Sequence, residues 1–130
     1  MKGQLIRMQY VAQKDGYSAQ YPGSNFEIIF EDESKVGRIW IARLPDSIHL
    51  VDIAILPQAQ HSGIGTKLIC ELQREAETAK KPICLSVFRF NEGSVRFHQR
   101  LGFAVVREDE IQLHLEWNPR SPISKDLKQP

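Results

Sequence analysis

A short glycine-bearing loop between two apolar segments has the residue pattern best suited to chemistry in this chain of 130 residues. The pattern is Gln60-x-x-Gly63-x-Gly65. Glycine has no Cβ, so the backbone N–H groups of such a loop approach an anion closely. A helix that begins within the loop adds the positive end of its macrodipole, worth about 0.3–1 kcal/mol per favourable charge. The loop therefore predicts an anion site of the kind that holds phosphate groups.

The segments on either side of the loop predict the two elements that would position it. Residues 50–56 are almost continuously apolar, which is typical of a strand buried on both faces, and Pro57 cannot continue its ladder. From Ile64 to Ala79 apolar side chains recur at helical spacing, while charged side chains cover the other side. We expect a strand, an anion-binding turn and a helix that packs one stripe on a sheet.

Two common phosphate motifs do not fit this loop. The P-loop of nucleotide-binding proteins ends in Gly-Lys-Ser/Thr, whereas the order here is Gly65-Thr66-Lys67. The dinucleotide fingerprint has a third glycine where this chain has Leu68. The loop must therefore belong to another class of phosphate site, or be a structural turn.

A second motif lies downstream in residues 91–103, which read NEGSVRFHQRLGF. It combines an asparagine, a short helix and a Leu-Gly-Phe ending, in which Gly102 suits a left-handed residue and Phe103 packs back on the helix. Together with the 60–66 loop, this segment resembles the GNAT superfamily of N-acetyltransferases. The order and separation of the two motifs match that superfamily, and the motifs span about half of the chain.

The resemblance implies acetyl-CoA as cosubstrate and a primary amine, of a small molecule or a protein, as acceptor, with direct attack of the amine on the thioester and no metal. It also implies that strand 50–56 splays away from strand 83–87, so that the pantetheine arm inserts between them. The implied coenzyme-binding positions are the main chain of Ile53, Ala54 and Ile55 for the thioester and pantetheine, the loop Gln60, His61, Ser62, Gly63, Ile64, Gly65 and Thr66 for the pyrophosphate, and Asn91 and Ser94.

Two histidines are the candidates for proton transfer. An amine with a pKa of about 10.4 is almost fully protonated at pH 7, so its attack requires a base or a desolvating site. His49 matches the position where some members of the superfamily carry a glutamate base, although a strand-end histidine bonded to water is the alternative. His98 shares a helical face with Asn91 and Ser94 and stands where tyrosine, the acid for the departing thiolate, is common. Its alternative is contact with the coenzyme without catalysis.

Asp52 is a further candidate base inside the apolar strand. A carboxylate in such a strand costs several kcal/mol unless it is paired, so a bond to a backbone group or an arginine is expected. No pair of histidines has metal-ligand spacing, and His114 is expected to be exposed on the last strand.

The remaining segments predict an α/β fold with a GNAT-like mixed sheet. Strands are expected at 26–30, 36–44, 83–87, 104–106 and 111–117, and a second helix at 91–101. The first two of these strands and strand 50–56 form an antiparallel meander, and the strand–helix–strand unit that follows implies a parallel pair.

The front of the chain is short for this superfamily. Residues 3–20 predict a helix that ends at Tyr21-Pro22-Gly23, and only about 25 residues precede Phe26. The usual first strand is therefore expected to be missing, and with it part of the wall around the acceptor. The acceptor pocket would then be open, completed by a second subunit in a homodimer, or lost. Loss would leave a regulatory or sensor module that binds acyl-CoA, which is the alternative function.

Composition fits a single globular domain, with 42% hydrophobic and 25% charged residues. We expect the domain over residues 1–118 and a flexible polar tail over 119–130. The formal net charge of +1 indicates neither a nucleic-acid nor a membrane partner. The sequence contains neither an apolar run of membrane-spanning length nor a signal-peptide core, so a cytoplasmic protein is expected. Cys70 and Cys84 lack metal-site spacing and are expected to be buried, reduced thiols.

Overall fold

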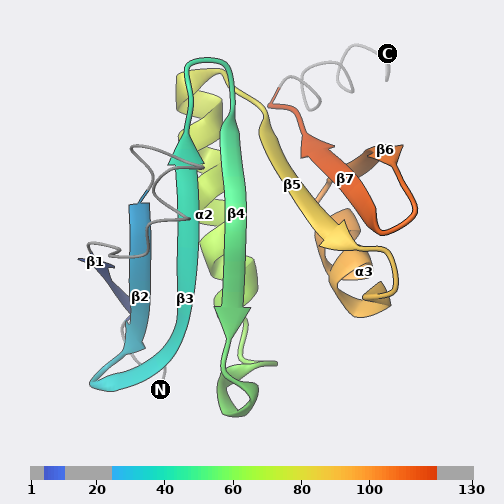
Figure 1. Cartoon of the computed structure of the whole chain (residues 1–130). Helices are drawn as coiled ribbons and strands as arrows, with labels where there is room; N and C mark the ends of the chain where they lie inside the picture. The colour runs from blue at the N-terminus through green and yellow to red at the C-terminus, as the bar shows by residue number, and fades with distance from the viewer. Residues whose placement is uncertain (1–4, 11–24, 120–130) are drawn as a thin grey trace, which may run out of the picture.

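A seven-stranded mixed sheet carries two helices on one of its faces (Figure 1). The structure is a computed structural model that describes residues 5–10 and 25–119. The strand order is β1-β2-β3-β4-β5-β7-β6. The elements are β1 (Leu5–Tyr10), β2 (Asn25–Glu31), β3 (Ser34–Arg43), β4 (Ile48–Ile55), the 3₁₀ turn η1 (Pro57–Ala59), α2 (Ile64–Ala79), β5 (Ile83–Phe88), α3 (Glu92–Arg100), β6 (Ala104–Glu108) and β7 (Gln112–Trp117).

The predicted fold class is confirmed. Strands β2, β3 and β4 form the expected antiparallel meander, and β4 pairs in parallel with β5 across the α2 crossover. Gly102 has the predicted left-handed conformation after α3, with φ of 100°, and the Phe103 side chain is buried behind it. The predicted tail lies almost wholly outside the described residues.

The prediction for the front of the chain is wrong. The predicted helix over residues 3–20 is replaced at Leu5–Tyr10 by β1, which pairs antiparallel with β2, so a strand does precede the meander. The rest of that prediction lies outside the described residues. A six-residue segment of mixed apolar and polar residues fits both the helical and the strand periodicity, and here pairing with the edge of β2 decides between them. Arg7 also ties the strand in place, because it pairs with Glu27 of β2 at 2.6 Å and with Glu71 of α2 at 3.0 Å.

Helix α2 buries one stripe against the sheet, as its spacing predicts. The stripe consists of residues that are at most 4% exposed, namely Ile64, Leu68, Ile69, Leu72 and Ala76. The flank of the helix is tied to β3 by a two-pronged ion pair between Glu75 and Arg43. The two cysteines are free thiols, but the prediction that they are buried holds only in part, because both are partly exposed.

Both helices lie on the same side of the sheet and contact each other. The Gln73 side chain of α2 donates a hydrogen bond to the Leu101 carbonyl at the end of α3, at 2.8 Å. The ring of Phe97 in α3 packs against Gly65 at the start of α2, where a Cβ would lie 3.3 Å from the ring. Among the described residues, both helices therefore cover the same face of the sheet (Figure 1).

Candidate active site

Strands β4 and β5 separate soon after they begin. They pair only at Ile48 with Ile83 and at His49 with Cys84, whereas β4 follows β3 along its whole length. Beyond these pairs a cavity of about 300 Å³ opens between the strands. The implied splay is therefore present. The cavity is lined by Leu50–Ile53 of β4, Leu85–Phe88 of β5, Asn91, Ser94 and His98 of the α3 segment, and Gln112 of β7.

A β-bulge marks the point where the strands separate. On β3, Ile41 pairs with Leu50 and the neighbouring Trp40 pairs with Asp52, so Val51 of β4 has no cross-strand partner. A bulge bends its strand and redirects the backbone groups around it. Val51 and the residues on both sides of it line the cavity. The bulge thus lies in the cavity wall, and no pattern in the sequence had predicted it.

The predicted anion loop leads into a helix N-terminus that no side chain caps. His61 and Gly63 both adopt left-handed φ values, of 69° and 83°. Helix α2 begins at Ile64 with no side-chain cap on its first N–H groups and no acidic residue in its first turn. Because the first N–H groups of a helix have no partner within the helix, they remain available to an anion. Gln60 donates its side-chain N–H to the Ile55 carbonyl at 2.9 Å, which fixes the loop to the end of β4.

The start of α3 is built differently. The Asn91 side chain caps this helix by accepting the Ser94 N–H at 3.2 Å, and Glu92 lies in the first turn. A capped N-terminus beside a carboxylate does not attract a phosphate. Asn91, Ser94 and His98 nevertheless line the cavity together, as their common helical face predicted.

His98 is the buried polar group of the cavity wall, with 3% of its surface exposed. Its ring lies between Phe97 and Phe103 in edge contacts. Nδ1 lies 2.9 Å from the Ser94 carbonyl oxygen, which only accepts, so Nδ1 carries the proton. Nε2 has no hydrogen-bond partner among the described residues. Burial lowers the pKa of His98 more strongly than the Ser94 bond raises it, which favours the neutral ring with a lone pair on Nε2.

The structure does not bring the second predicted histidine into the cavity. His49 lies at the paired end of the junction, opposite Cys84, and is not among the lining residues. Asp52 does line the cavity, and its carboxylate accepts a 2.7 Å bond from Arg38. The prediction that Asp52 is paired with an arginine is thus confirmed.

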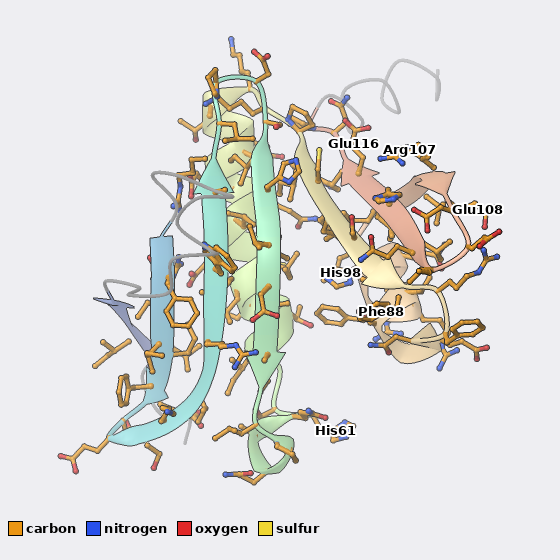
Figure 2. All side chains as sticks on the ribbon, viewed as in Figure 1. His61, Phe88, His98, Arg107, Glu108 and Glu116 are labelled. Carbon is orange, nitrogen blue, oxygen red and sulfur yellow. The ribbon has the colours of Figure 1, made fainter. Side chains whose placement is uncertain are left out.

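Of the three β4 residues predicted to bind the coenzyme through their main chain, one lies in the cavity lining. Ile53 lines the cavity, but Ala54 and Ile55 do not, and the Ile55 carbonyl accepts a hydrogen bond from the Gln60 side chain. The 60–66 loop likewise lies outside the lining, beyond the end of β4, where Figure 2 shows His61 separated from His98 and Phe88. A ligand that bound at both the cavity and the 60–66 loop would extend along the end of β4.

Three side chains on the other face of the sheet were missed. Ser86 lines the cavity and lies 2.8 Å from His114, which in turn lies 3.3 Å from Asp109. The expectation that His114 is exposed holds only in part, since 20% of its side chain is accessible. Ser86 lies 28 positions before His114, which is too far for a local pattern to reveal their contact. The Asp109 turn alone had a recognisable signal, because aspartate often opens a turn.

Within the described ranges 5–10 and 25–119, no cluster of three or more His, Cys, Asp or Glu residues has the arrangement of a metal site. The helices in those ranges are also too short or too polar to cross a membrane.

A mixed sheet that opens between two parallel strands, beside an uncapped helix N-terminus, is an arrangement suited to a long anionic ligand. The sequence model described as "Acetyltransferase (GNAT) family" matches residues 5–103. The chain belongs to the GNAT acetyltransferase family. The match includes β1, in agreement with the strand found there.

Solved structures share this fold at low sequence identity. The PaiA N-acetyltransferase of Thermoplasma acidophilum, in complex with coenzyme A, has a TM-score of 0.67 and 22% identity, and the match covers 79% of this chain and 65% of that one. A GNAT family acetyltransferase from Elizabethkingia anophelis with acetyl-CoA bound has a TM-score of 0.72 and 11% identity, covering 88% and 97%. Arabidopsis thaliana Naa50, in complex with the bisubstrate analogue CoA-Ac-MVNAL, has a TM-score of 0.67 and 17% identity, covering 82% of both chains.

The match thus spans just under two thirds of the Thermoplasma protein. At these identities the likeness concerns the fold. No curated protein matches the chain significantly.

Proposed function

We propose that this chain transfers the acetyl group of acetyl-CoA to a primary amine of a small molecule or a protein, by direct attack of the amine on the thioester. The observation that carries the proposal is the cavity between β4 and β5, whose wall contains a buried acceptor, His98 Nε2, that has no partner among the described residues. Buried polar atoms in native proteins are almost always bonded, so an orphan in a cavity wall points to a ligand that supplies the donor.

Acetyl-CoA fits the two parts of the site, which are the N-terminus of α2 and the cavity between β4 and β5. Its pyrophosphate would bind the free N–H groups in the first turn of α2, where no acidic residue opposes it. Its pantetheine arm would cross the cavity, where backbone groups at the Val51 bulge face it. An amide N–H of that arm is a suitable donor for His98 Nε2. The bound coenzyme A or acetyl-CoA in two of the similar structures supports this choice of ligand.

The structure bears differently on the acid role predicted for His98 and on the base role predicted for His49. As a neutral ring protonated at Nδ1, His98 has no proton at Nε2 to give to a departing thiolate. This favours coenzyme contact over the acid role. A coenzyme thiol with an ordinary pKa near 8.5 leaves as a thiolate without strict need of an acid. The role of His49 as base stays a prediction, and its position outside the cavity lining does not support it.

A second candidate function is a module that binds acyl-CoA without transferring the acyl group. The observation that favours it is the absence of a protonated group at His98 Nε2, at the position where the superfamily commonly has tyrosine. The argument from a missing front strand no longer supports it, because β1 is present.

Thermal unfolding with acetyl-CoA, with ATP as control anion, tests the coenzyme site. A ligand at a hundredfold its Kd stabilises the folded state by about 2.7 kcal/mol, so the melting temperature should rise with acetyl-CoA and not with ATP. Release of coenzyme thiol across an amine panel then separates enzyme from module. Binding without thiol release for any amine would favour the module, and the absence of a shift at millimolar coenzyme would contradict both functions.

A matched pair of variants at Thr66 makes this test specific for the loop. Thr66 is exposed in the first turn of α2. Thr66→Asp adds a carboxylate that favours the helix N-terminus but repels pyrophosphate, whereas Thr66→Asn is similar in size and uncharged. We expect the acetyl-CoA shift to disappear in Thr66→Asp, while its unliganded melting temperature is retained, and to persist in Thr66→Asn. Equal shifts in both variants would place the pyrophosphate elsewhere.

A further inference from the structure

Three hydrogen-bonded side chains lie on the face of the sheet opposite the helices. Ser86 of β5 and His114 of β7 are direct cross-strand partners, with Ser86 Oγ 2.8 Å from His114 Nδ1. His114 Nε2 lies 3.3 Å from Oδ2 of Asp109, in the turn between β6 and β7. Ser86 also lines the cavity. The chain of bonds therefore connects the cavity to a carboxylate 23 positions along the sequence from Ser86.

The direction of these bonds follows from the chemistry of the end groups. A carboxylate only accepts, so His114 donates from Nε2 to Asp109 and the neutral ring keeps its lone pair on Nδ1. That lone pair accepts the hydroxyl proton of Ser86. The oxygen of Ser86 then has free lone pairs on the cavity side, where a donor such as an ammonium group can bind.

Asp109 is held in place by its own turn. Its Oδ1 accepts the backbone N–H groups of Ile111 at 2.9 Å and Gln112 at 2.7 Å. These two bonds, followed by the bond from His114, lower the pKa of Asp109 to about 2, so the carboxylate is charged at neutral pH. Arg89, just after β5, donates to the Asp109 carbonyl at 2.6 Å and fixes the turn to the end of that strand.

Ser86 and His98 reach the cavity from opposite sides of the sheet. Leu85 of β5 and Leu115 of β7 are buried on the helix side, so their neighbours Ser86 and His114 face away from the helices. His98 comes from α3, which Figure 2 shows on the far side of β5. A coenzyme bound on the helix side would present its thioester between the two, and an amine would arrive from the Ser86 side.

We propose that Ser86 binds the acceptor amine and passes its proton to His114, with Asp109 as a positioning residue that orients the His114 ring. This inference rests on the proposed acetyl transfer. The ammonium group gives one proton to Ser86 Oγ as the Ser86 hydroxyl proton moves to His114 Nδ1, so the substrate becomes neutral and His114 becomes an imidazolium beside Asp109. The neutral amine attacks the carbonyl carbon, the N–C bond forms, the C–S bond breaks, and the second amine proton goes to the coenzyme thiolate. His114 returns its proton to solvent.

The charges around His114 come from several elements. Arg107 of β6 is its register partner and Glu116 lies two residues along β7, on the same face. Across the sheet, Cys84 of β5 pairs with Glu116, and Asp52 of β4 is neutralised by Arg38. Of these groups, only Ser86 and Asp109 have a hydrogen bond to the His114 ring.

Steady-state kinetics of thiol release, with an amine that the wild type accepts, tests the relay. His114→Gln keeps a donor and an acceptor on one side chain but cannot take a proton, and Ser86→Ala removes the relay oxygen. Because general bases contribute about 10²–10⁴-fold, we expect both variants to lower kcat/KM for the amine at least 100-fold at pH 7. Ser86→Thr retains the hydroxyl and should recover most of the loss. The acetyl-CoA thermal shift should be unchanged in all three.

Asp109→Asn tests the positioning role. An amide N–H facing His114 Nε2 reverses the ring tautomer, so Nδ1 no longer accepts from Ser86. We expect a large fall in kcat/KM and a pH profile in which only the ionisation of the amine remains, as in His114→Gln. Glu110→Gln, in the same exposed turn, removes a charge without touching the ring and should match the wild type.

The outcomes separate the relay from the function on which it rests. Wild-type turnover with Ser86→Ala and His114→Gln unchanged within about threefold would overturn the relay alone. An acetyl group found on Ser86 by mass spectrometry, after incubation with acetyl-CoA without amine, would make Ser86 a nucleophile and also overturn it. A wild type that binds acetyl-CoA but releases no thiol with any amine would remove the proposed function and the relay together.

Discussion

The two ends of the β4–β5 junction differ in what they do. At the paired end, Ile48 and Ile83 are register partners, each at most 1% exposed, and His49 lies opposite Cys84. At the open end, the same two strands expose main-chain and polar groups to a cavity that contains His98 and Ser86. Two histidines that were equivalent candidates in the sequence thus lie in different regions, one beside the core and one in the cavity wall.

One extra residue in β4, Val51, therefore separates a stretch of the strand that stabilises the sheet from a stretch that lines the cavity. The Val51 bulge lies between the end that pairs with β5 and the end that does not. Before it, burial and ladder hydrogen bonds stabilise the sheet. After it, β4 and β5 no longer pair, so their facing polar groups can bind a ligand. The sheet is less stable there because those ladder hydrogen bonds are missing.

The largest effect is expected from a substitution at the paired end of the β4–β5 junction. Ile83→Ala removes a fully buried side chain and should lower the free energy of unfolding by about 2–5 kcal/mol. Val87→Ala, at the open end of the same strand, should cost about 1 kcal/mol or less because Val87 is already partly exposed. Urea denaturation measures the loss of unfolding free energy in each variant, provided that the m-values of the variants and the wild type are equal. Equal losses would contradict the division of the strand into two regions.

An intermediate effect, on the Kd for acetyl-CoA, is expected from substitution of His98 but not of His49. His98→Phe keeps a buried ring but removes the acceptor, so the Kd for acetyl-CoA should rise about tenfold, the equivalent of about 1.4 kcal/mol. His49→Phe is the matched change at the paired end and should alter the Kd by less than about twofold. Calorimetric titration of both variants measures this. A 100-fold loss of turnover in His49→Phe, at unchanged Kd, would instead identify His49 as the base.

The smallest expected effect is a pH dependence at the open end. Burial lowers the pKa of His98 in the folded chain, whereas the unfolded chain takes up the proton near pH 6.5. Below about pH 6.5 the unfolded state therefore binds more protons, and the free energy of unfolding falls as the pH drops. His98→Phe removes this contribution. The wild type should lose more stability than the variant between pH 7.5 and 5.5, and parallel curves would show that folding does not lower the pKa of His98.

Local patterns predicted most of the fold. The alternating and continuous apolar runs located β2 to β7, and the spacing from Ile64 to Ala79 located α2 with its buried stripe. The failure at Leu5–Tyr10 has a physical cause, since a short apolar segment adopts whichever form its neighbours can complete, and the edge of β2 completes a strand. Helical spacing alone predicted that Asn91, Ser94 and His98 share one face, and this face lies in the cavity wall.

The sequence by itself determined which segments become strands and helices, which loop presents free N–H groups, and which family the chain resembles. These features depend on spacing within a few residues, so they can be read locally. Only the tertiary structure decided that His98 enters the cavity and His49 does not, and that Ser86, His114 and Asp109 meet. Those outcomes depend on the register of paired strands and on one bulge, and a shift of one residue in its strand would turn His49, Ser86 or His114 to the other face of the sheet.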